Sequence, residues 1–216
     1  MTHDLVIIGA GGFGRETLDV VRAINDITPT WDVLGFADDA LSEINSKRLN
    51  ALSVPHLGGL TSIPNGTSVA VAVGNPTTRR AIVHSLGDRY PFPALVHPTT
   101  VCGSQLRHGE GLIVLSGVSL GTNVTLGDHV HLNAHAVIGH DTRLHNFVSV
   151  NPNATISGEC DVGEQTLIGA TSTVLQGLTV GSRVTLGAAA CLTKDSPDHA
   201  TLVGVPARPL HEGPTS

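Results

Sequence analysis

His140 and Asp141 are the neighbouring residues whose side chains are best suited to chemistry, in the stretch VIGHDTRLHNF at residues 137–147. An imidazole titrates near neutrality, so a histidine can take the proton of an attacking amine or hydroxyl. An adjacent carboxylate can orient the ring and stabilise its protonated form. The pair therefore suggests acyl transfer, although spacing alone leaves open a solvated surface pair, and Asp128-His129 is a second acid–histidine neighbour pair.

A six-residue period surrounds this pair and begins at Val114. Glycine recurs one place after the aliphatic position, as at Gly121 and Gly139, and small or β-branched residues recur four places after it. An unbroken hexapeptide period predicts a β-solenoid in which three hexads complete one triangular coil. Aliphatic side chains would fill its interior, and glycine would relieve backbone strain near the corners. The aliphatic positions are Val114, Leu120, Leu126, Leu132, Ile138, Leu144, Val150, Ile156, Val162, Ile168, Val174, Val180, Leu186 and Leu192.

The period places His140 on the outside of the predicted coil. Ile138 points inward, so His140, two places later, falls at a corner and faces outward. Gly158 follows eighteen residues after His140, one full coil further along at the same corner. Its backbone N–H is suited to stabilise the oxyanion of a tetrahedral intermediate. The spacing alone therefore predicts that a base and an oxyanion donor share one corner.

The sequence before the period predicts a different kind of domain. Alternating strands and helices indicate an α/β unit with a short parallel sheet. We therefore predict a small Rossmann-like domain at 1–95, a β-solenoid at 96–194, and a cap followed by a loose tail at 195–216, which makes the fold α/β plus all-β. The expected strands are 5–8, 33–36, 69–73 and 94–96, and the expected helices are 14–24 and 76–86.

A glycine loop, GAGGFG, joins the first expected strand to the first expected helix. Gly9, Gly11 and Gly14 match the G-x-G-x-x-G pattern, and Asp38 and Asp39 end the next strand. This context favours a phosphate at the helix N-terminus and an acid on a ribose. The domain is too short for both halves of an NAD site, so a mononucleotide sugar fits better. A ligand-free glycine turn that packs the helix on its strand is the alternative.

Composition narrows the class of partner. The formal charge of −6 and the pI near 6.0 provide no basic surface for nucleic acid or an anionic membrane. No signal peptide or membrane span is expected. The cysteines Cys102, Cys160 and Cys191 follow no metal or disulfide spacing, so we interpret them as small buried residues in a reducing compartment. We expect a soluble cytoplasmic protein.

The hexapeptide run occurs together with GAGGFGRE at 9–16, GHD at 139–141 and VGVPARPL at 203–210. With these motifs the chain resembles the left-handed β-helix acyltransferases of the sialic-acid O-acetyltransferase and nucleotide-amino-sugar N-acetyltransferase group. The resemblance implies a left-handed β-helix and a homotrimer. It also implies acetyl-CoA as co-substrate in the cleft between neighbouring β-helices, with a nucleotide sugar reaching in from the first domain.

By motif position the resemblance assigns His140 as catalytic base and Asp141 as the acid that supports it. Many relatives carry histidines where Phe13 and Ser149 stand, beside the acceptor and the cofactor thioester. Their replacement puts the usual diaminosugar acceptor in question. Arg79 would lie near the nucleotide pocket. The remaining implied contacts are Ser149, Gly158, Ala170 and Ala188 for the cofactor, and Gly11, Gly12, Phe13, Asp38, Asp39 and Gly74 for the substrate.

Three functions remain open at this level. The favoured one is N-acetylation of a nucleotide-linked amino sugar, with O-acetylation of a hydroxyl as its variant. The second is a γ-type carbonic anhydrase, because His135 and His140 have the spacing of two of its zinc ligands. Thr99 stands where the third ligand would lie, so no metal is expected. The third is a sugar-binding scaffold without catalysis.

Overall fold

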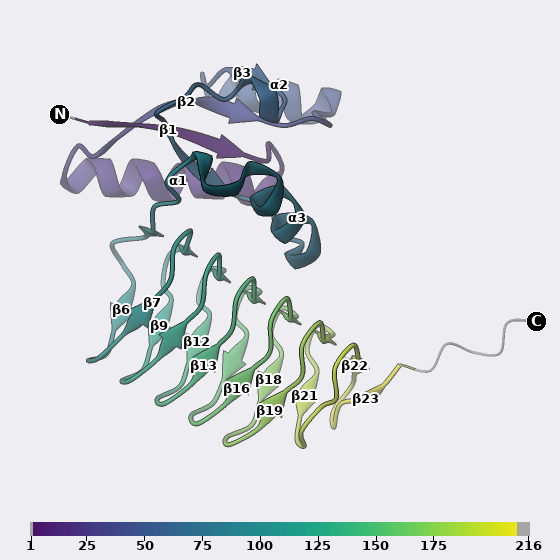
Figure 1. The fold of residues 1–216 in the computed structure, drawn as a ribbon. Helices are drawn as coiled ribbons and strands as arrows, with labels where there is room; N and C mark the ends of the chain where they lie inside the picture. The colour runs from purple at the N-terminus through teal and green to yellow at the C-terminus, as the bar shows by residue number, and fades with distance from the viewer. Residues whose placement is uncertain (1, 211–216) are drawn as a thin grey trace, which may run out of the picture.

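A computed structural model describes residues 2–210 of the chain. An α/β domain packs on one face of a long left-handed parallel β-helix, near the β-helix N-terminus (Figure 1). Leu95 and Ile113 of the β-helix share a hydrophobic cluster with Leu18 and Val21 of the first domain. The two parts are therefore joined by a common core.

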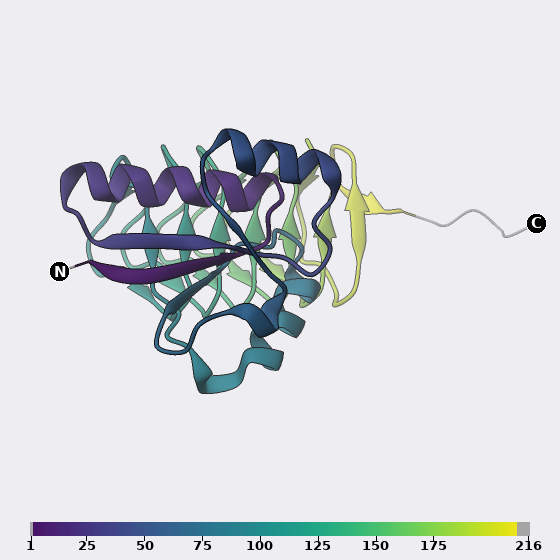
Figure 2. The same ribbon diagram turned by 90° about the horizontal axis from the view of Figure 1, so that it is seen from above.

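The first domain contains a four-stranded parallel sheet of order β3-β2-β1-β4. Its strands are β1 (His3–Ile8), β2 (Trp31–Ala37), β3 (His56–Gly58) and β4 (Ser68–Val71). Its helices are α1 (Gly12–Ile27), α2 (Glu43–Ala51) and α3 (Pro76–Leu86), with short 3-10 turns at Leu60–Ser62 and Gly87–Arg89. Figure 2 shows α1 and α3 on opposite sides of the sheet. The predicted helix at 76–86 has the observed bounds of α3.

The aliphatic run of β1 is buried because both faces of the sheet are covered, as expected for a parallel sheet. Leu5 and Ile7 pack with α1, whereas Val6 and Ile8 pack with the cluster that contains Leu86 of α3. This sheet fixes the loops that follow β1, β2 and β4 at one edge. Among residues 2–210, no helix has the length and apolar character needed to cross a bilayer.

The β-helix has three faces, and each face is one sheet. The strands of each sheet are parallel, except for the last strand of the eight-stranded sheet, which is antiparallel to its neighbour. The eight-stranded sheet contains β5 (Leu95–Val96), β8 (Ile113–Val114), β11 (His131–Leu132), β14 (Ser149–Val150), β17 (Leu167–Ile168), β20 (Thr185–Leu186), β22 (Thr201–Val203) and β23 (Arg208–Pro209). The six-stranded sheet contains β6 (Val101–Cys102), β9 (Ser119–Leu120), β12 (Val137–Ile138), β15 (Thr155–Ile156), β18 (Thr173–Val174) and β21 (Cys191–Leu192). The five-stranded sheet contains β7 (Arg107–His108), β10 (Thr125–Leu126), β13 (Arg143–Leu144), β16 (Asp161–Val162) and β19 (Thr179–Val180).

The predicted interior positions are confirmed along the whole period. Every aliphatic residue from Val114 to Leu192 in that series is buried, and the most accessible, Leu192, is 3 % exposed. Consecutive coils pair in register eighteen residues apart, for example Ile138 with Ile156. The corners between sheets therefore lie at the same place in each coil, which stacks chosen residues above one another.

The predicted role of the recurring glycines was wrong. The left-handed backbone conformation falls two places later in the hexad, at residues such as Asn123 and Asp141, with φ of 56° and 57°. Glycine is needed instead for close approach between coils. A Cβ on Gly121 would lie 2.6 Å from the backbone nitrogen of His140 in the next coil.

Other details of the sequence prediction need correction. The segment 94–96 does not complete the first sheet, because β5 pairs with β8 and begins the β-helix. Cys102 is exposed and Cys191 is half-buried, so of the three cysteines only Cys160 is buried. Cys102 lies in β6, which ends its sheet and so has no coil stacked on its outer side.

The predicted cap is built by β22 and β23, which pair antiparallel at the end of the eight-stranded sheet. The predicted loose tail falls partly on residues 211–216, which lie outside the described residues.

Candidate active site

The His140–Asp141 pair lies at the corner between the six- and five-stranded sheets, just after β12. His140 Nδ1 is 2.8 Å from Asp141 Oδ2, and the two side chains are 52 % and 45 % exposed. An ionised carboxylate can only accept, so Nδ1 carries the proton and Nε2 is left as the basic atom. The predicted outward orientation of His140 is confirmed.

Asn123 supports the pair from the preceding coil. Its Nδ2 donates to Asp141 Oδ1 over 2.7 Å. This hydrogen bond, followed by the one from His140, lowers the pKa of Asp141 below its ordinary value. Asp141 is therefore charged at neutral pH and can stabilise a protonated imidazole. Asn123 was not predicted, although the eighteen-residue period aligns it with Asp141.

Gly158 lies against the imidazole ring in the following coil. A Cβ at this position would be 2.6 Å from His140 Cε1 and Nε2, so only glycine leaves room for the ring. Within residues 2–210, the Gly158 N–H donates to no protein acceptor. A base and a free amide thus meet at one corner, which we call the His140 edge.

Ala170 and Ala188 lie elsewhere. They follow β17 and β20 and occupy the corner between the eight- and six-stranded sheets, which we call the Ala170 edge. The whole width of the six-stranded sheet separates this edge from His140. One chain therefore does not bring Ala170 and Ala188 to the predicted base, whereas Gly158, another predicted cofactor residue, lies beside it.

Ser149 does not fit the expected cofactor contact. It is 1 % exposed, and its hydroxyl accepts from Arg79 Nη2 over 2.9 Å and donates to the Gly74 carbonyl over 3.0 Å. Arg79 is fully buried between the two domains rather than at the nucleotide pocket. Both residues thus belong to the domain junction.

A cavity of about 460 Å³ opens at the edge of the first sheet where the loops after β1, β2 and β4 meet. Three predicted substrate residues, Gly11, Asp38 and Asp39, line it. Gly12 and Gly74 are not on its wall. Phe13 is also absent, and its ring stacks on His131 with 4.6 Å between ring centroids.

The glycine loop has the geometry that a phosphate site requires. Gly9 has φ +98°, and a Cβ on Gly14 would overlap the Gly9 carbonyl oxygen, so these two glycines shape the turn and the approach of α1. Gly11 faces open space at the N-cap of α1. The uncapped N–H groups of α1 therefore point toward the cavity with a favourable dipole for an anion.

The two carboxylates at this cavity differ in how many hydrogen bonds they already accept from the protein. Asp38 accepts from the Ala10 and Ala40 amides, both over 2.8 Å, so it holds the loops in place. Asp39 is exposed and accepts from the Leu60 amide over 3.2 Å with one oxygen. Asp39 is thus the better placed of the two to accept from a ribose hydroxyl.

Sequence reasoning missed the apolar wall of this cavity. Leu60, Thr78 and Ile82 line it together with the residues around β4. Thr78 and Ile82 are four residues apart on α3, so they share one helix face. That spacing was readable in the predicted helix at 76–86.

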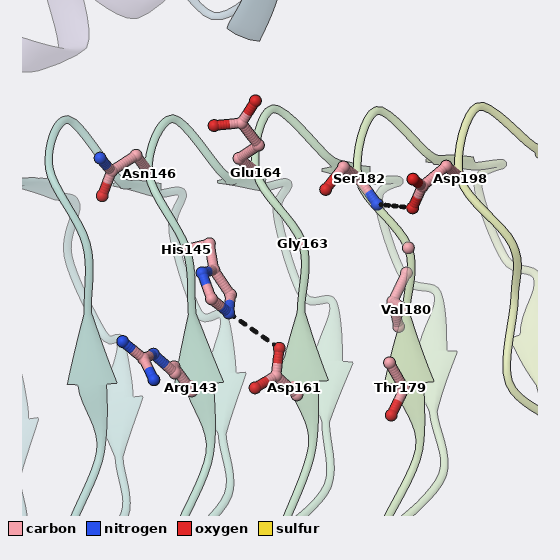
Figure 3. Close-up of a pocket in the computed structure, with 11 residues that line it drawn as sticks. Arg143, His145, Asn146, Asp161, Gly163, Glu164, Thr179, Val180, Ser182 and Asp198 are labelled. Atoms are coloured by element: carbon pink, nitrogen blue, oxygen red, sulfur yellow. Dashed lines mark hydrogen bonds and ion pairs between the residues drawn. The ribbon is translucent and has the colours of Figure 1, made fainter.

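A second histidine–carboxylate pair lies in a polar groove of about 510 Å³ on the five-stranded sheet (Figure 3). His145 Nε2 is 2.9 Å from Asp161 Oδ1. The ring does not lie against Gly163 as His140 lies against Gly158, and the Gly163 amide donates to Val180. The Gly163 amide, one coil after His145, is therefore not free in the way that the Gly158 amide is.

The carbonic anhydrase alternative loses its geometric basis. His135 precedes β12 and His140 follows it, so the two lie at opposite edges of the six-stranded sheet. Across the described part of the chain, no three histidine, cysteine or acidic side chains gather as metal ligands would.

Comparison with known proteins gives consistent relatives. The PglD N-terminal domain family matches residues 4–86. GDP-perosamine N-acetyltransferase of Escherichia coli O157:H7 is 28 % identical over 97 % of both chains.

Solved structures match over the whole length. The acetyltransferase domain of PglB from Neisseria gonorrhoeae, solved with acetyl coenzyme A, has a TM-score of 0.84 and 32 % identity, covering 97 % of this chain and 100 % of that one. PerB from Caulobacter crescentus, solved with CoA and GDP-perosamine, has a TM-score of 0.86 and 28 % identity, covering 98 % and 99 %.

Proposed function

This chain belongs to the left-handed β-helix acyltransferases of the sialic-acid O-acetyltransferase and nucleotide-amino-sugar N-acetyltransferase group, and we propose that it N-acetylates a nucleotide-linked amino sugar with His140 as general base. It is an acetyltransferase, and acetyl-CoA is its acyl donor. The observation that carries the catalytic assignment is the His140 imidazole, which is held by Asp141 and lies against Gly158, a residue whose N–H has no acceptor among the described residues.

The residues of the His140 edge fit the steps of acyl transfer. Nε2 of His140 takes a proton from the sugar amine as its nitrogen attacks the thioester carbonyl carbon. Asp141 stabilises the resulting imidazolium, and the Gly158 N–H donates to the oxyanion. The C–S bond then breaks, and the imidazolium returns its proton to the leaving thiolate. The products are the acetamido sugar and CoA.

In this proposal the first domain binds the acceptor, the nucleotide sugar. The N-terminus of α1 beside Gly11 suits the diphosphate, and Asp39 suits a ribose hydroxyl. The apolar wall around Thr78 and Ile82 suits the flat base. Two of the relatives named above, the Escherichia coli enzyme and PerB, are described with GDP-perosamine, which supports a nucleoside diphosphate with an amino sugar as substrate class.

We propose that three copies assemble with the six-stranded sheet facing the threefold axis. The outward residues of this sheet carry no charge, whereas the five-stranded sheet presents Arg107, Arg143 and Asp161. An uncharged face packs without the cost of desolvating ions. The His140 edge of one copy would then meet the Ala170 edge of the next and enclose one acetyl-CoA. The outward residues are Val101, Ser119, Val137, Thr155, Thr173 and Cys191.

The cellular location that fits this chemistry is the cytoplasm. Cys102, Cys160 and Cys191 are all free thiols, which fits a reducing compartment such as the cytoplasm.

The test is a coupled assay of thiol release. Purified protein is mixed with acetyl-CoA and a panel of nucleotide sugars. The panel includes GDP-perosamine and the same nucleotide sugar with a hydroxyl in place of the amine, and a control sample contains no acceptor. Release that requires the amine supports N-acetylation, release with the hydroxyl sugar supports O-acetylation, and binding without release supports a scaffold. Light scattering on the same sample measures the oligomeric state.

The matched variants are His140→Ala and His145→Ala. We expect the first to lower kcat by about 10²- to 10⁴-fold, the range for loss of a general base. The second removes a histidine that is 39 % exposed, against 52 % for His140, and is also paired with a carboxylate, and it should leave kcat within about twofold. Equal losses in the two variants would contradict the assignment of the base.

A further inference from the structure

Arg79 of α3 is the largest buried charged group of the chain, and it lies where the two domains meet. Its exposed fraction is 0 %. Burial lowers its pKa to about 9, which leaves it charged at neutral pH. Among the residues that the structure describes, no carboxylate pairs with it. Such a charge is stable in the interior only when its N–H groups are fully hydrogen-bonded.

One side of the guanidinium holds the first domain. Nη1 donates to the carbonyl oxygens of Val73 over 2.8 Å and Gly74 over 3.2 Å. These two residues form the turn between β4 and α3. Val73 in this turn and Thr78 in the first turn of α3 both line the proposed nucleotide cavity. Arg79 does not line the acceptor cavity, but it ties the turn beside that cavity to the domain junction.

The other side holds two successive coils of the β-helix. Nε donates to the His129 carbonyl over 3.0 Å. Nη2 donates to the Phe147 carbonyl over 2.8 Å and to the Ser149 hydroxyl over 2.9 Å. Phe147 and Ser149 follow His140 along the same turn of the β-helix. One planar group thus connects the acceptor pocket to the coil that carries the proposed base.

Ser149 closes the connection with a second path. Its hydroxyl accepts from Arg79 and donates to Gly74, so the turn after β4 is held to the β-helix twice. Arginine is suited to this task because its fork presents five donors in a fixed plane. A lysine retains the charge but cannot reach acceptors on both domains at once.

We propose that Arg79 is a positioning residue that sets where the nucleotide pocket stands relative to the catalytic coils, and so where the sugar amine arrives. This inference rests on the proposed N-acetylation. It adds that neither substrate site depends on Arg79 for binding. Only the alignment between acceptor and base depends on it, and a misplacement of about 1 Å can cost about 10²-fold in rate.

The test compares Arg79→Lys with Arg80→Lys, its exposed neighbour on the same helix. Three quantities are measured: kcat with the nucleotide amino sugar that the wild-type enzyme turns over, KM for acetyl-CoA, and Kd for the corresponding nucleoside diphosphate alone. We expect Arg79→Lys to lower kcat by about 10- to 100-fold while both affinities change less than about twofold. Arg80→Lys should leave all three within about twofold.

A role confined to stability would give a different result. For a purely structural role, the melting temperature would fall while kcat per folded protein stayed at the wild-type value. For a role in binding, the affinity for the diphosphate would fall together with kcat. Either result overturns the proposal. If Arg79→Lys does not fold, Ser149→Ala decides, because it removes only one hydroxyl. We expect a kcat loss of about 3- to 10-fold with unchanged affinities, and an unchanged kcat would overturn the proposal.

The proposed function and this inference fail in different ways. If wild-type protein releases no thiol with any amino sugar, the proposed function is wrong. If wild-type protein is active and both arginine variants behave alike, only the positioning role is wrong.

Discussion

The histidines of the His140 edge and of the domain junction are in opposite environments. His140 is half exposed and its Nδ1 lies 2.8 Å from a carboxylate. His131 is fully buried, and its Nδ1 accepts from Arg79 over 3.0 Å. His129 is 1 % exposed and stacks on Phe147. The same side chain is thus prepared to gain a proton at one site and prevented from gaining one at the other.

This difference shows that the charge of the neighbouring group and the burial of the ring, rather than the residue type, decide which histidine can act as a base. Burial and the charge of Arg79 lower the pKa of His129 to about 4, with Asp128 acting weakly in the opposite direction. The same two causes, with a further contribution from His129, lower the pKa of His131 well below its ordinary value, and the Val71 carbonyl opposes them. Both rings pack as neutral groups: His131 Nδ1 accepts from Arg79, whereas the ring nitrogens of His129 have no hydrogen-bond partner among the described residues.

After the loss of His140 itself, the largest expected effect comes from a change that displaces its ring. Gly158→Ala places a Cβ 2.6 Å from the His140 ring, so the imidazole must move away from Asp141 or from the amide. We expect kcat to fall by about 10²- to 10³-fold. Steady-state kinetics measure it, with Ser157→Ala as the neighbouring control. A Gly158→Ala enzyme of normal kcat would show that the ring position does not matter.

The next effect tests the buried side. The folded pKa of His129 is about 4 and the unfolded value is about 6.5, so the unfolded state binds more protons between these pH values. Stability is then complete above pH 6.5 and is lost as the pH falls toward 4, by up to about 3 kcal/mol for this residue. Urea unfolding at pH 7.5, 6, 5 and 4.5 measures the loss.

His129→Phe is the control for that prediction. Phe147 already occupies the equivalent left-handed position one coil later, with φ 61°, so a phenyl ring is tolerated there. The acid-side slope should become shallower in this variant. A slope identical to that of the wild type would assign the acid sensitivity to other groups.

A smaller effect separates the carboxylate from the imidazole. Asp141→Asn keeps the shape but removes the charge that stabilises the imidazolium, and we expect kcat to fall by about 10- to 100-fold. Because the pKa of Asp141 is lowered, the carboxylate stays charged from pH 5 to 8. The acid limb of the wild-type rate profile above pH 5 should therefore not arise from Asp141. A limb that disappears in Asp141→Asn would mean that the carboxylate is the titrating group.

The smallest effect sharpens the role of the preceding coil. Asn123→Ala removes the hydrogen bond that contributes most to the lowered pKa of Asp141. We expect that pKa to rise toward its ordinary value, and kcat at pH 7 to fall by about two- to fivefold. NMR titration of the Asp141 carboxyl and kinetics at pH 7 measure the two quantities. An unchanged carboxyl titration would remove Asn123 from the site.

The sequence predicted most where a local rule applies to every residue. The inward series from Val114 to Leu192 was readable because a two-residue strand repeats every six positions. The same spacing predicts Gly158 one coil after His140 at the same corner, where the structure has it. The role of glycine was misjudged because a close approach between coils and a left-handed backbone both favour glycine.

Prediction failed where structure depends on contacts without a period. Arg79 reaches His129 across 50 residues and Ser149 across 70 residues. No spacing rule connects those positions, so the hydrogen bonds of Arg79 between the two domains could not be predicted from the sequence. The helix α2 was missed because its only buried residue is Leu49. The segment 94–96 was assigned to the wrong sheet because a short aliphatic strand suits either one.

The in-register ladder of the β-helix also limits how such a chain can change in length. Each turn hydrogen-bonds to the turns on either side in the same way, so one whole turn can be duplicated or deleted far from His140 without rotating the corners. Any other number of residues must bulge out at a corner, or it would turn inward-facing side chains toward solvent. Growth by complete turns would lengthen the Ala170 edge while the His140 edge kept its geometry.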